Sequence, residues 1–155
     1  MTIRLQKILL PTDFSEYSAA ATKYACELAM KFDAELHLLH TLETHISSTP
    51  EFGFGLDLPK YVSESKAAAA KSLAGVLDPK WSEGRTVIHA VVEGSPKLEI
   101  IQYARKQNID LIVLSTPGRT GLTHVLMGSV AETVVRTAPC PVLTVRPEGH
   151  QFVMP

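Results

Sequence analysis

The sequence predicts a single α/β domain: a doubly wound parallel sheet of five strands in the order 3-2-1-4-5, with helices on both faces. Short apolar runs alternate along the chain with longer segments of helical period, which is typical of parallel strands joined by crossover helices. The runs Ile8–Leu10 and Leu111–Leu114 are continuously apolar, as expected for strands buried on both faces. A chain of 155 residues, 45% of them hydrophobic, can also bury a sizeable core. We expect this domain to span residues 1–147 and residues 148–155 to form a loose tail.

The first elements are a strand, a helix and a second strand. The strand lies within residues 6–13, where the apolar burst stops at Pro11. The helix covers 15–33, with Ser15 as a candidate N-cap. Its expected buried face repeats every three or four residues and consists of Tyr17, Ala21, Tyr24 or Ala25, Leu28 and Phe32. Residues 34–43 then form the second strand.

The middle of the chain continues the alternation. Residues 44–57 contain proline and glycine without a period, which predicts a loop. An alanine-rich helix follows at 58–77, then a third strand at 85–94. Residues 95–108 open with Ser-Pro, the pairing of N-cap and first-turn residue that favours a helix.

The last elements are a strand at 110–115, a helix at 129–137 and a strand at 141–146. Because parallel strands need right-handed crossovers, the helices are divided between the two faces of the sheet. The result is a Rossmann-like arrangement, in which ligands bind outside the carboxyl ends of the strands where the strand order reverses.

Bulk properties exclude several classes of protein. The formal net charge is −1, from 15 basic and 16 acidic residues, which gives no electrostatic footprint for nucleic acid or an anionic membrane. No apolar run approaches the roughly 20 residues of a membrane span, and the N-terminus does not have the pattern of a signal peptide. Cys26 and Cys140 form no metal-type pair and fit free thiols in a reducing cytoplasm, with a disulfide between them left open.

Two polar segments should meet at one edge of this sheet. Ser115 ends the fourth strand, and Pro11 to Asp13 end the first. These two strands are neighbours in the expected order, so the switch point lies between them. We therefore expect both segments to line one crevice.

The segment after the fourth strand has the chemistry of an anion site. Gly118 and Gly128 allow positive φ or close approach of a ligand to the backbone. A helix beginning at Ser129 would direct unpaired N–H groups into the crevice, and Arg119 carries a full positive charge. Hydroxyl donors are supplied by Ser115, Thr116, Thr120 and Ser129.

Asp13 supplies the complementary chemistry, because an ionised carboxylate only accepts hydrogen bonds and suits the two hydroxyls of a ribose. A sugar that binds at Asp13 and phosphates that bind along 115–129 would belong to one nucleotide, so these residues together indicate a nucleotide site. Structural alternatives stay open: the glycines can simply shape turns, and Asp13 can cap the following helix. Ser129 with Glu132 also forms a capping box, and Arg119 can be a solvated surface charge.

Several stretches resemble the universal stress protein family over nearly the whole chain. They are ILLPTDFSEYS at 8–18, LHLLHTLE at 36–43, VVEGSP at 91–96 and the long segment DLIVLSTPGRTGLTHVLMGSVAETVVRTAPCPVLTVR at 110–146. The ATP-binding members carry G-x2-G-x9-G-(S/T). Here Gly118, Gly128 and Ser129 match that pattern, Ser115 replaces the first glycine, and Pro117 stands where the family often has histidine.

The resemblance implies a site for ATP, or for AMP or ADP, with or without Mg²⁺. Pro11, Thr12 and Asp13 would flank the ribose and adenine, and Thr41 would contact adenine through its backbone. The phosphate loop would be lined by Leu114, Ser115, Thr116, Gly118 and Arg119 and closed by Gly128, Ser129 and Val130. The resemblance also implies a homodimer through the last strand, Pro141 to Arg146, whose unpaired edge a symmetric partner can satisfy.

Three functions follow from these observations. The first is a cytoplasmic stress-response protein that binds an adenine nucleotide and acts as a regulatory homodimer. The second is a nucleotide-free dimerisation module, favoured by Ser115 and Pro117. The third is a slow ATPase. The chain carries neither a G-x-S-x-G elbow nor a Walker motif, and no pair of carboxylates is expected beside the loop to hold a metal. We therefore expect no catalytic residues.

Overall fold

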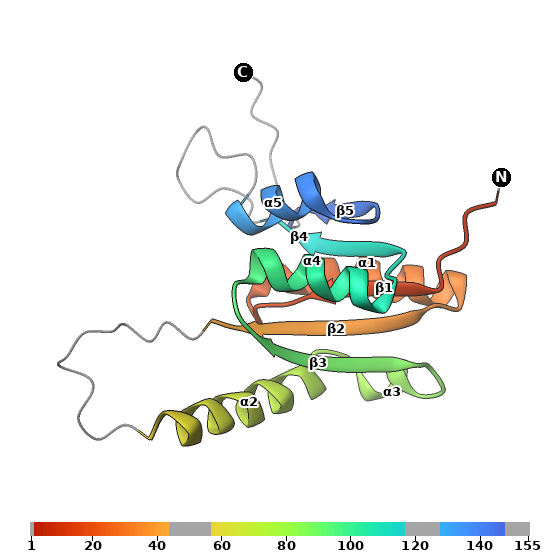
Figure 1. Cartoon of the computed structure of the whole chain (residues 1–155). Helices are drawn as coiled ribbons and strands as arrows, with labels where there is room; N and C mark the ends of the chain where they lie inside the picture. Colours follow the sequence, from red (N-terminus) through yellow and green to blue (C-terminus); the bar gives the residue numbers. More distant parts are fainter. Residues whose placement is uncertain (1, 44–56, 117–127, 148–155) are drawn as a thin grey trace.

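The computed structural model describes residues 2–43, 57–116 and 128–147, and these ranges form one parallel sheet flanked by helices (Figure 1). The strands are β1 (Lys7–Pro11), β2 (Glu35–Leu42), β3 (Val87–Glu93), β4 (Leu111–Ser115) and β5 (Val142–Val145). The helices are α1 (Glu16–Phe32), α2 (Leu58–Ala74), α3 (Pro79–Ser82), α4 (Pro96–Gln107) and α5 (Ser129–Thr137). The expected tail at 148–155 lies outside the described residues, as does most of the expected loop at 44–57.

The strand order is β3-β2-β1-β4-β5, with every pair parallel, which confirms the predicted topology. At the centre, Ile8 of β1 lies opposite Leu111 of β4, and Leu9 lies opposite Ile112. The first and fourth strands are therefore neighbours, and their carboxyl ends meet at one edge of the sheet.

Each face of the sheet has its own apolar core. Ile8 and Leu10 point into a cluster with α1 and α2, whereas Leu9 points into a cluster with α4 and α5. All three side chains are fully buried. Because successive strand residues alternate between two covered faces, both sets must be apolar, which explains the continuous run in the sequence.

The helix α1 begins as expected, since Ser15 is its N-cap and accepts a hydrogen bond from the Ser18 amide. The expected buried face was partly wrong. Its buried residues are Ser18, Ala21, Ala25 and Ala29, whereas Tyr24 is 55% and Phe32 38% exposed. Small side chains let the helix approach the sheet closely, and the large aromatic rings remain at its flanks.

Other boundaries shift by a few residues. The predicted helix at 58–77 ends at Ala74, and a short helix that the sequence did not suggest, α3, follows it. Ser95 is the N-cap of α4, but its side chain makes no capping hydrogen bond. Cys26 and Cys140 are free cysteines.

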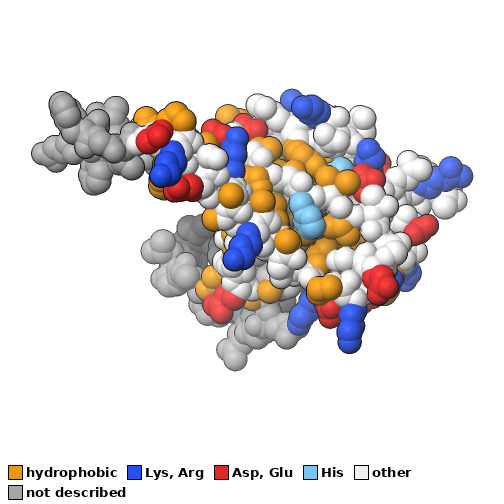
Figure 2. All heavy atoms as spheres, turned by 90° about the horizontal axis from the view of Figure 1, so that it is seen from below, with side chains coloured by type: hydrophobic (Ala, Val, Ile, Leu, Met, Phe, Trp, Pro, Cys, Tyr) orange, Lys and Arg blue, Asp and Glu red, His pale blue; other side chains and the backbone are white. Residues whose placement is uncertain are grey.

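The edge strand β3 and the helix α2 form the face seen in Figure 2, where hydrophobic side chains gather in the middle and most charged side chains lie toward the margins. Ile88 of β3 and Tyr61 of α2 are 38% and 56% exposed. None of the helices in the described ranges has the length and apolar character that a membrane crossing requires.

Candidate functional site

A cavity of about 480 Å³ opens at the carboxyl ends of β1, β2 and β4. Nine residues that the sequence predicted for the site line it: Pro11, Thr12, Asp13, Thr41, Leu114, Ser115, Gly128, Ser129 and Val130. Thr116 is buried, and its amide donates to the carbonyl of Val145, so it supports the sheet instead of lining the cavity. Gly118 and Arg119 lie outside the described residues, as does Thr120.

Asp13 follows β1 and sits at the entrance to α1. Its Oδ1 atom accepts hydrogen bonds from the amide of Ser15 at 3.0 Å and from the hydroxyl of Ser18 at 2.6 Å. Desolvation raises the pKa of the Asp13 carboxyl, but the hydrogen bonds from Ser15 and Ser18 outweigh it and leave the pKa below its ordinary value. The side chain is therefore an ionised acceptor at neutral pH. Ser15, not Asp13, is the N-cap of α1, and Asp13 supports that cap through its two hydrogen bonds while it lines the cavity.

The end of β2 forms the adjoining wall. The amide of Thr12 donates to the carbonyl of Leu39 at 2.9 Å, which ties the turn after β1 to this strand. Nδ1 of His40 lies 2.8 Å from the Thr12 carbonyl oxygen, and the His40 ring stacks on Phe14. His40, which the sequence analysis did not predict for the site, lines the cavity beside Thr41.

The helix α5 begins on the opposite side of the cavity, and here two expectations need correction. Gly128, not Ser129, is the N-cap, and among the described residues no side chain makes a capping hydrogen bond at this end. The capping box therefore does not form: Glu132 instead binds Arg136 at 2.8 Å. Gly128 has φ −65°, an ordinary value, so its conformation does not require glycine. What glycine provides at this position is space at the cavity wall.

The first turn of α5 supplies donors to the cavity. The first bond of the helix runs from the Glu132 amide to the Gly128 carbonyl, so the amides of Ser129, Val130 and Ala131 have no partner inside the helix. These residues line the cavity, and a helix N-terminus attracts anions. Among the described lining residues the charged side chains are the carboxylates of Asp13 and Glu43, so in this part of the wall the backbone amides are the donors best suited to an anion.

Apolar and aromatic residues that the sequence did not single out complete the lining. They are Tyr17, Leu39, Leu42, Pro96 and Ile100. Pro96 and Ile100 come from the first turns of α4, which follows β3 and begins at the same edge of the sheet. A signal was available for them, because the first turns after each strand of a doubly wound fold face the ligand crevice.

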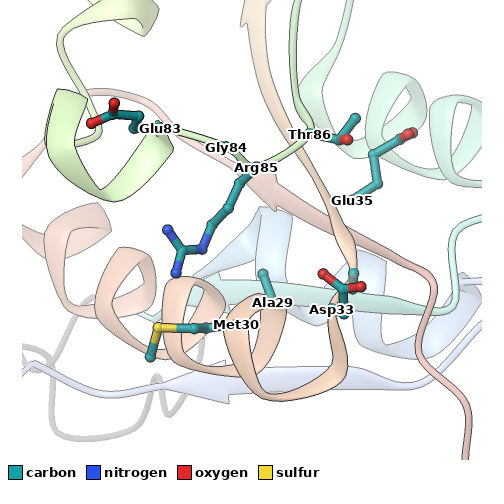
Figure 3. A pocket seen from close by; sticks show the side chains of 9 residues that line it. Ala29, Met30, Asp33, Glu35, Glu83, Gly84, Arg85 and Thr86 are labelled. Carbon is teal, nitrogen blue, oxygen red and sulfur yellow. The ribbon is translucent and has the colours of Figure 1, made fainter.

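A second cavity, of about 290 Å³, lies at the opposite, amino-terminal edge of the sheet (Figure 3). Asp33, Glu35, Glu83 and Arg85 contribute its charged side chains. Arg85 extends toward Met30 of α1 in Figure 3, and its guanidinium group lies over the ring of Trp81 and donates to the Trp81 carbonyl. The described residues that the sequence predicted for the site line the first cavity, at the other edge of the sheet.

The described ranges contain no group of three or more His, Cys, Asp or Glu side chains placed to hold a metal ion. The cavity at the carboxyl ends of the strands offers a carboxylate acceptor, hydroxyl groups, helix amides and an apolar wall. This combination suits a ligand with a sugar, an anionic group and an aromatic ring.

Comparison with known proteins bears on the family of the chain and on its fold. The model of the universal stress protein family matches residues 4–146. The universal stress protein MJ0531 of Methanocaldococcus jannaschii is 36% identical over 142 residues, covering 91% of this chain and 82% of its own length.

Solved structures share the fold as well. The structure of the hypothetical protein MJ0577 superposes with a TM-score of 0.78 at 29% identity, covering 95% of this chain and 99% of that one. A universal stress protein in complex with cAMP has a TM-score of 0.68 at 20% identity, with 93% and 98% coverage. The Archaeoglobus fulgidus protein in complex with dAMP has a TM-score of 0.60 at 19% identity, with 93% and 99% coverage.

Proposed function

The chain belongs to the universal stress protein family, and from this premise we propose that it binds an adenine nucleotide, ATP or AMP or ADP, in the cavity at the carboxyl ends of the strands. It acts as a cytoplasmic regulatory homodimer, in which the bound nucleotide biases the contacts that the dimer makes. The ribose lies at Asp13, the adenine lies beside Thr41, and the phosphates face the first turn of α5.

One observation carries this proposal. A carboxylate acceptor at the end of β1 and helix amides that have no partner inside α5 lie on the wall of the same cavity, which also has apolar lining residues. Ribose hydroxyls donate to a carboxylate, phosphate oxygens accept from amides, and a purine fits an apolar wall. The Ser15 amide and the Ser18 hydroxyl both donate to Oδ1 of Asp13, and in this proposal the sugar hydroxyls donate to Oδ2.

The ligands of related structures support the choice of base. Universal stress proteins of the same fold have been solved with cAMP and with dAMP, and both ligands contain adenine and a phosphate. In the present chain, Gly118 and Arg119 would complete the phosphate loop, and Mg²⁺ can accompany a triphosphate.

A nucleotide-free dimerisation module is the second candidate. Ser115 stands where the ATP-binding pattern has its first glycine, and it lines the cavity, so a side chain occupies space there. The absence of a lysine or arginine from the described lining favours the same candidate. A slow ATPase is the third candidate, and it requires turnover many-fold above background that is lost in Asp13→Ala.

Native mass spectrometry of the purified protein, followed by thermal unfolding with ATP, ADP and AMP, with and without Mg²⁺, separates these candidates. We expect copurified adenine nucleotide, or a rise in the unfolding temperature with at least one of the three. Gly128→Arg should abolish the rise, because the new side chain fills the cavity beside α5. His89→Ala, on the exposed edge strand β3, is the matched control and should keep the rise. No response from the wild-type protein to any adenine nucleotide would favour the nucleotide-free module.

A further inference from the structure

We propose that His40 and Phe14 form a clamp that positions the Asp13 carboxylate and thereby makes the cavity selective for ribonucleotides over deoxyribonucleotides. Both are positioning residues, since they act through the turn that carries Asp13. This inference rests on the proposed function and adds a specificity-determining pair to it.

The His40 side chain fixes the turn from the side of β2. Its Nδ1 atom lies 2.8 Å from the carbonyl oxygen of Thr12. A carbonyl oxygen only accepts, so Nδ1 carries the proton and donates it. The same ring stacks on Phe14, with 4.3 Å between ring centroids and 28° between planes. One imidazole therefore holds the residues on both sides of Asp13.

Phe14 has a backbone conformation that few side chains of its size adopt. Its φ is 65°, in the left-handed region, where a bulky residue is an outlier. Its amide donates to Oγ1 of Thr12 at 3.1 Å. Strained residues of this kind persist when their surroundings over-determine them, and they cluster at ligand sites. The His40 ring and the Thr12 hydroxyl supply those constraints.

Empty space lies on the far side of the turn. His40 lines the nucleotide cavity, whereas Phe14 lines a neighbouring cavity of about 540 Å³ between α1 and the last turn of α2. Thr12, Ser15 and Ser18 line both cavities. Without the stack between Phe14 and His40, the turn has room to relax toward the neighbouring cavity and to carry the Asp13 carboxylate with it.

A displaced carboxylate affects one part of the ligand more than the rest. Ribose hydroxyls need an acceptor at a fixed place, whereas adenine and phosphate contact other walls of the cavity. Loss of the clamp should therefore weaken ribonucleotide binding until it resembles deoxyribonucleotide binding. A purely structural role would lower stability and leave the ratio of the two affinities unchanged.

The test measures dissociation constants by calorimetry for AMP, 2′-deoxy-AMP and 3′-deoxy-AMP, and for the triphosphates if they bind more tightly. We expect the wild-type protein to prefer the ribonucleotide by about tenfold over at least one deoxy form, the range of a hydrogen bond to a charged group. His40→Ala should reduce the preference to about twofold or less, whereas His40→Gln, which keeps an N–H donor, should restore most of it. His89→Ala is the control and should match the wild type.

Phe14→Gly separates folding from selectivity. Glycine adopts positive φ freely, so this variant relieves the backbone strain while it removes the stacked ring. Its unfolding temperature should stay near that of the wild type, and its ribose preference should fall as in His40→Ala. An unchanged preference in both His40→Ala and Phe14→Gly overturns the clamp and leaves nucleotide binding intact, as does a wild-type protein without ribose preference. A wild-type protein that binds no adenine nucleotide overturns the proposed function and the clamp together.

Discussion

At the scale of single residues, a buried histidine outside the cavity links stability to pH. His37 of β2 is 2% exposed. Its Nε2 atom donates to the carboxylate of Glu35 at 2.6 Å, and its Nδ1 atom accepts from the hydroxyl of Tyr103 at 2.8 Å. Burial lowers the pKa of His37, although the hydrogen bond and charge of Glu35 act in the opposite direction and the charge of Lys7 lowers it further. The neutral ring satisfies both partners.

This environment predicts that the protein loses stability as the pH falls below about 6.5, the ordinary pKa of histidine. In that range the unfolded chain binds a proton at His37 that the folded protein does not, so acid favours unfolding. Chemical denaturation between pH 7.5 and 5.5 should show the free energy of unfolding falling with a slope of up to about 1.4 kcal/mol per pH unit from this residue. His37→Gln should flatten that slope, and an equally steep dependence in the variant would contradict the assignment.

At the scale of secondary structure elements, the sequence predicted whether each element is a helix or a strand better than it predicted buried faces and boundaries. The alternation of strands and helices was readable because buried parallel strands have continuous apolar runs. The buried face of α1 was partly wrong because close packing on the sheet selects Ala21 and Ala25 over the larger Tyr24, which periodicity alone cannot show. The capping box considered for Ser129 and Glu132 at the start of α5 does not form, because Gly128 occupies the N-cap, one residue earlier than that pattern requires.

Helix ends also offer a test of backbone energetics. The C-cap of α1 is Asp33, which adopts the left-handed conformation with φ 52° and ψ 44°, and its side chain is exposed. That conformation costs an L-residue about 1–2 kcal/mol, and glycine avoids this strain. Glycine also loses more conformational freedom on folding, which offsets about 0.5–1 kcal/mol of the gain. Asp33→Gly should therefore raise the free energy of unfolding by about 0.5–1 kcal/mol, measured in urea. Glu27→Gly, in the middle of the same helix, should lower it by about 1 kcal/mol. A destabilised Asp33→Gly protein would show that the carboxylate stabilises this end.

At the scale of the whole molecule, the topology determined most of the site before any side-chain geometry was known. The predicted order placed the ends of β1 and β4 side by side, and nine predicted residues line the resulting cavity. The sequence could not reveal His40, because its role depends on a contact with Thr12 across two strands. Nor could it assign Thr116 to the sheet, since that depends on the register with β5.

The same topology leaves two edge strands, β3 and β5, and the predicted homodimer uses β5. The carbonyls of Pro141 and Val145 accept from β4, so by alternation the backbone groups of Thr144 point toward the free edge. Thr144→Pro removes one outward N–H and no bond to β4, so we expect the proposed dimer to become a folded monomer, measured by light scattering after size exclusion and by circular dichroism. On β3 the carbonyl of Thr86 accepts from β2, so His89 points its backbone outward too, and His89→Pro is the matched variant at the other edge. A dimeric Thr144→Pro with a monomeric His89→Pro would place the interface on β3, the edge with the hydrophobic face of Figure 2.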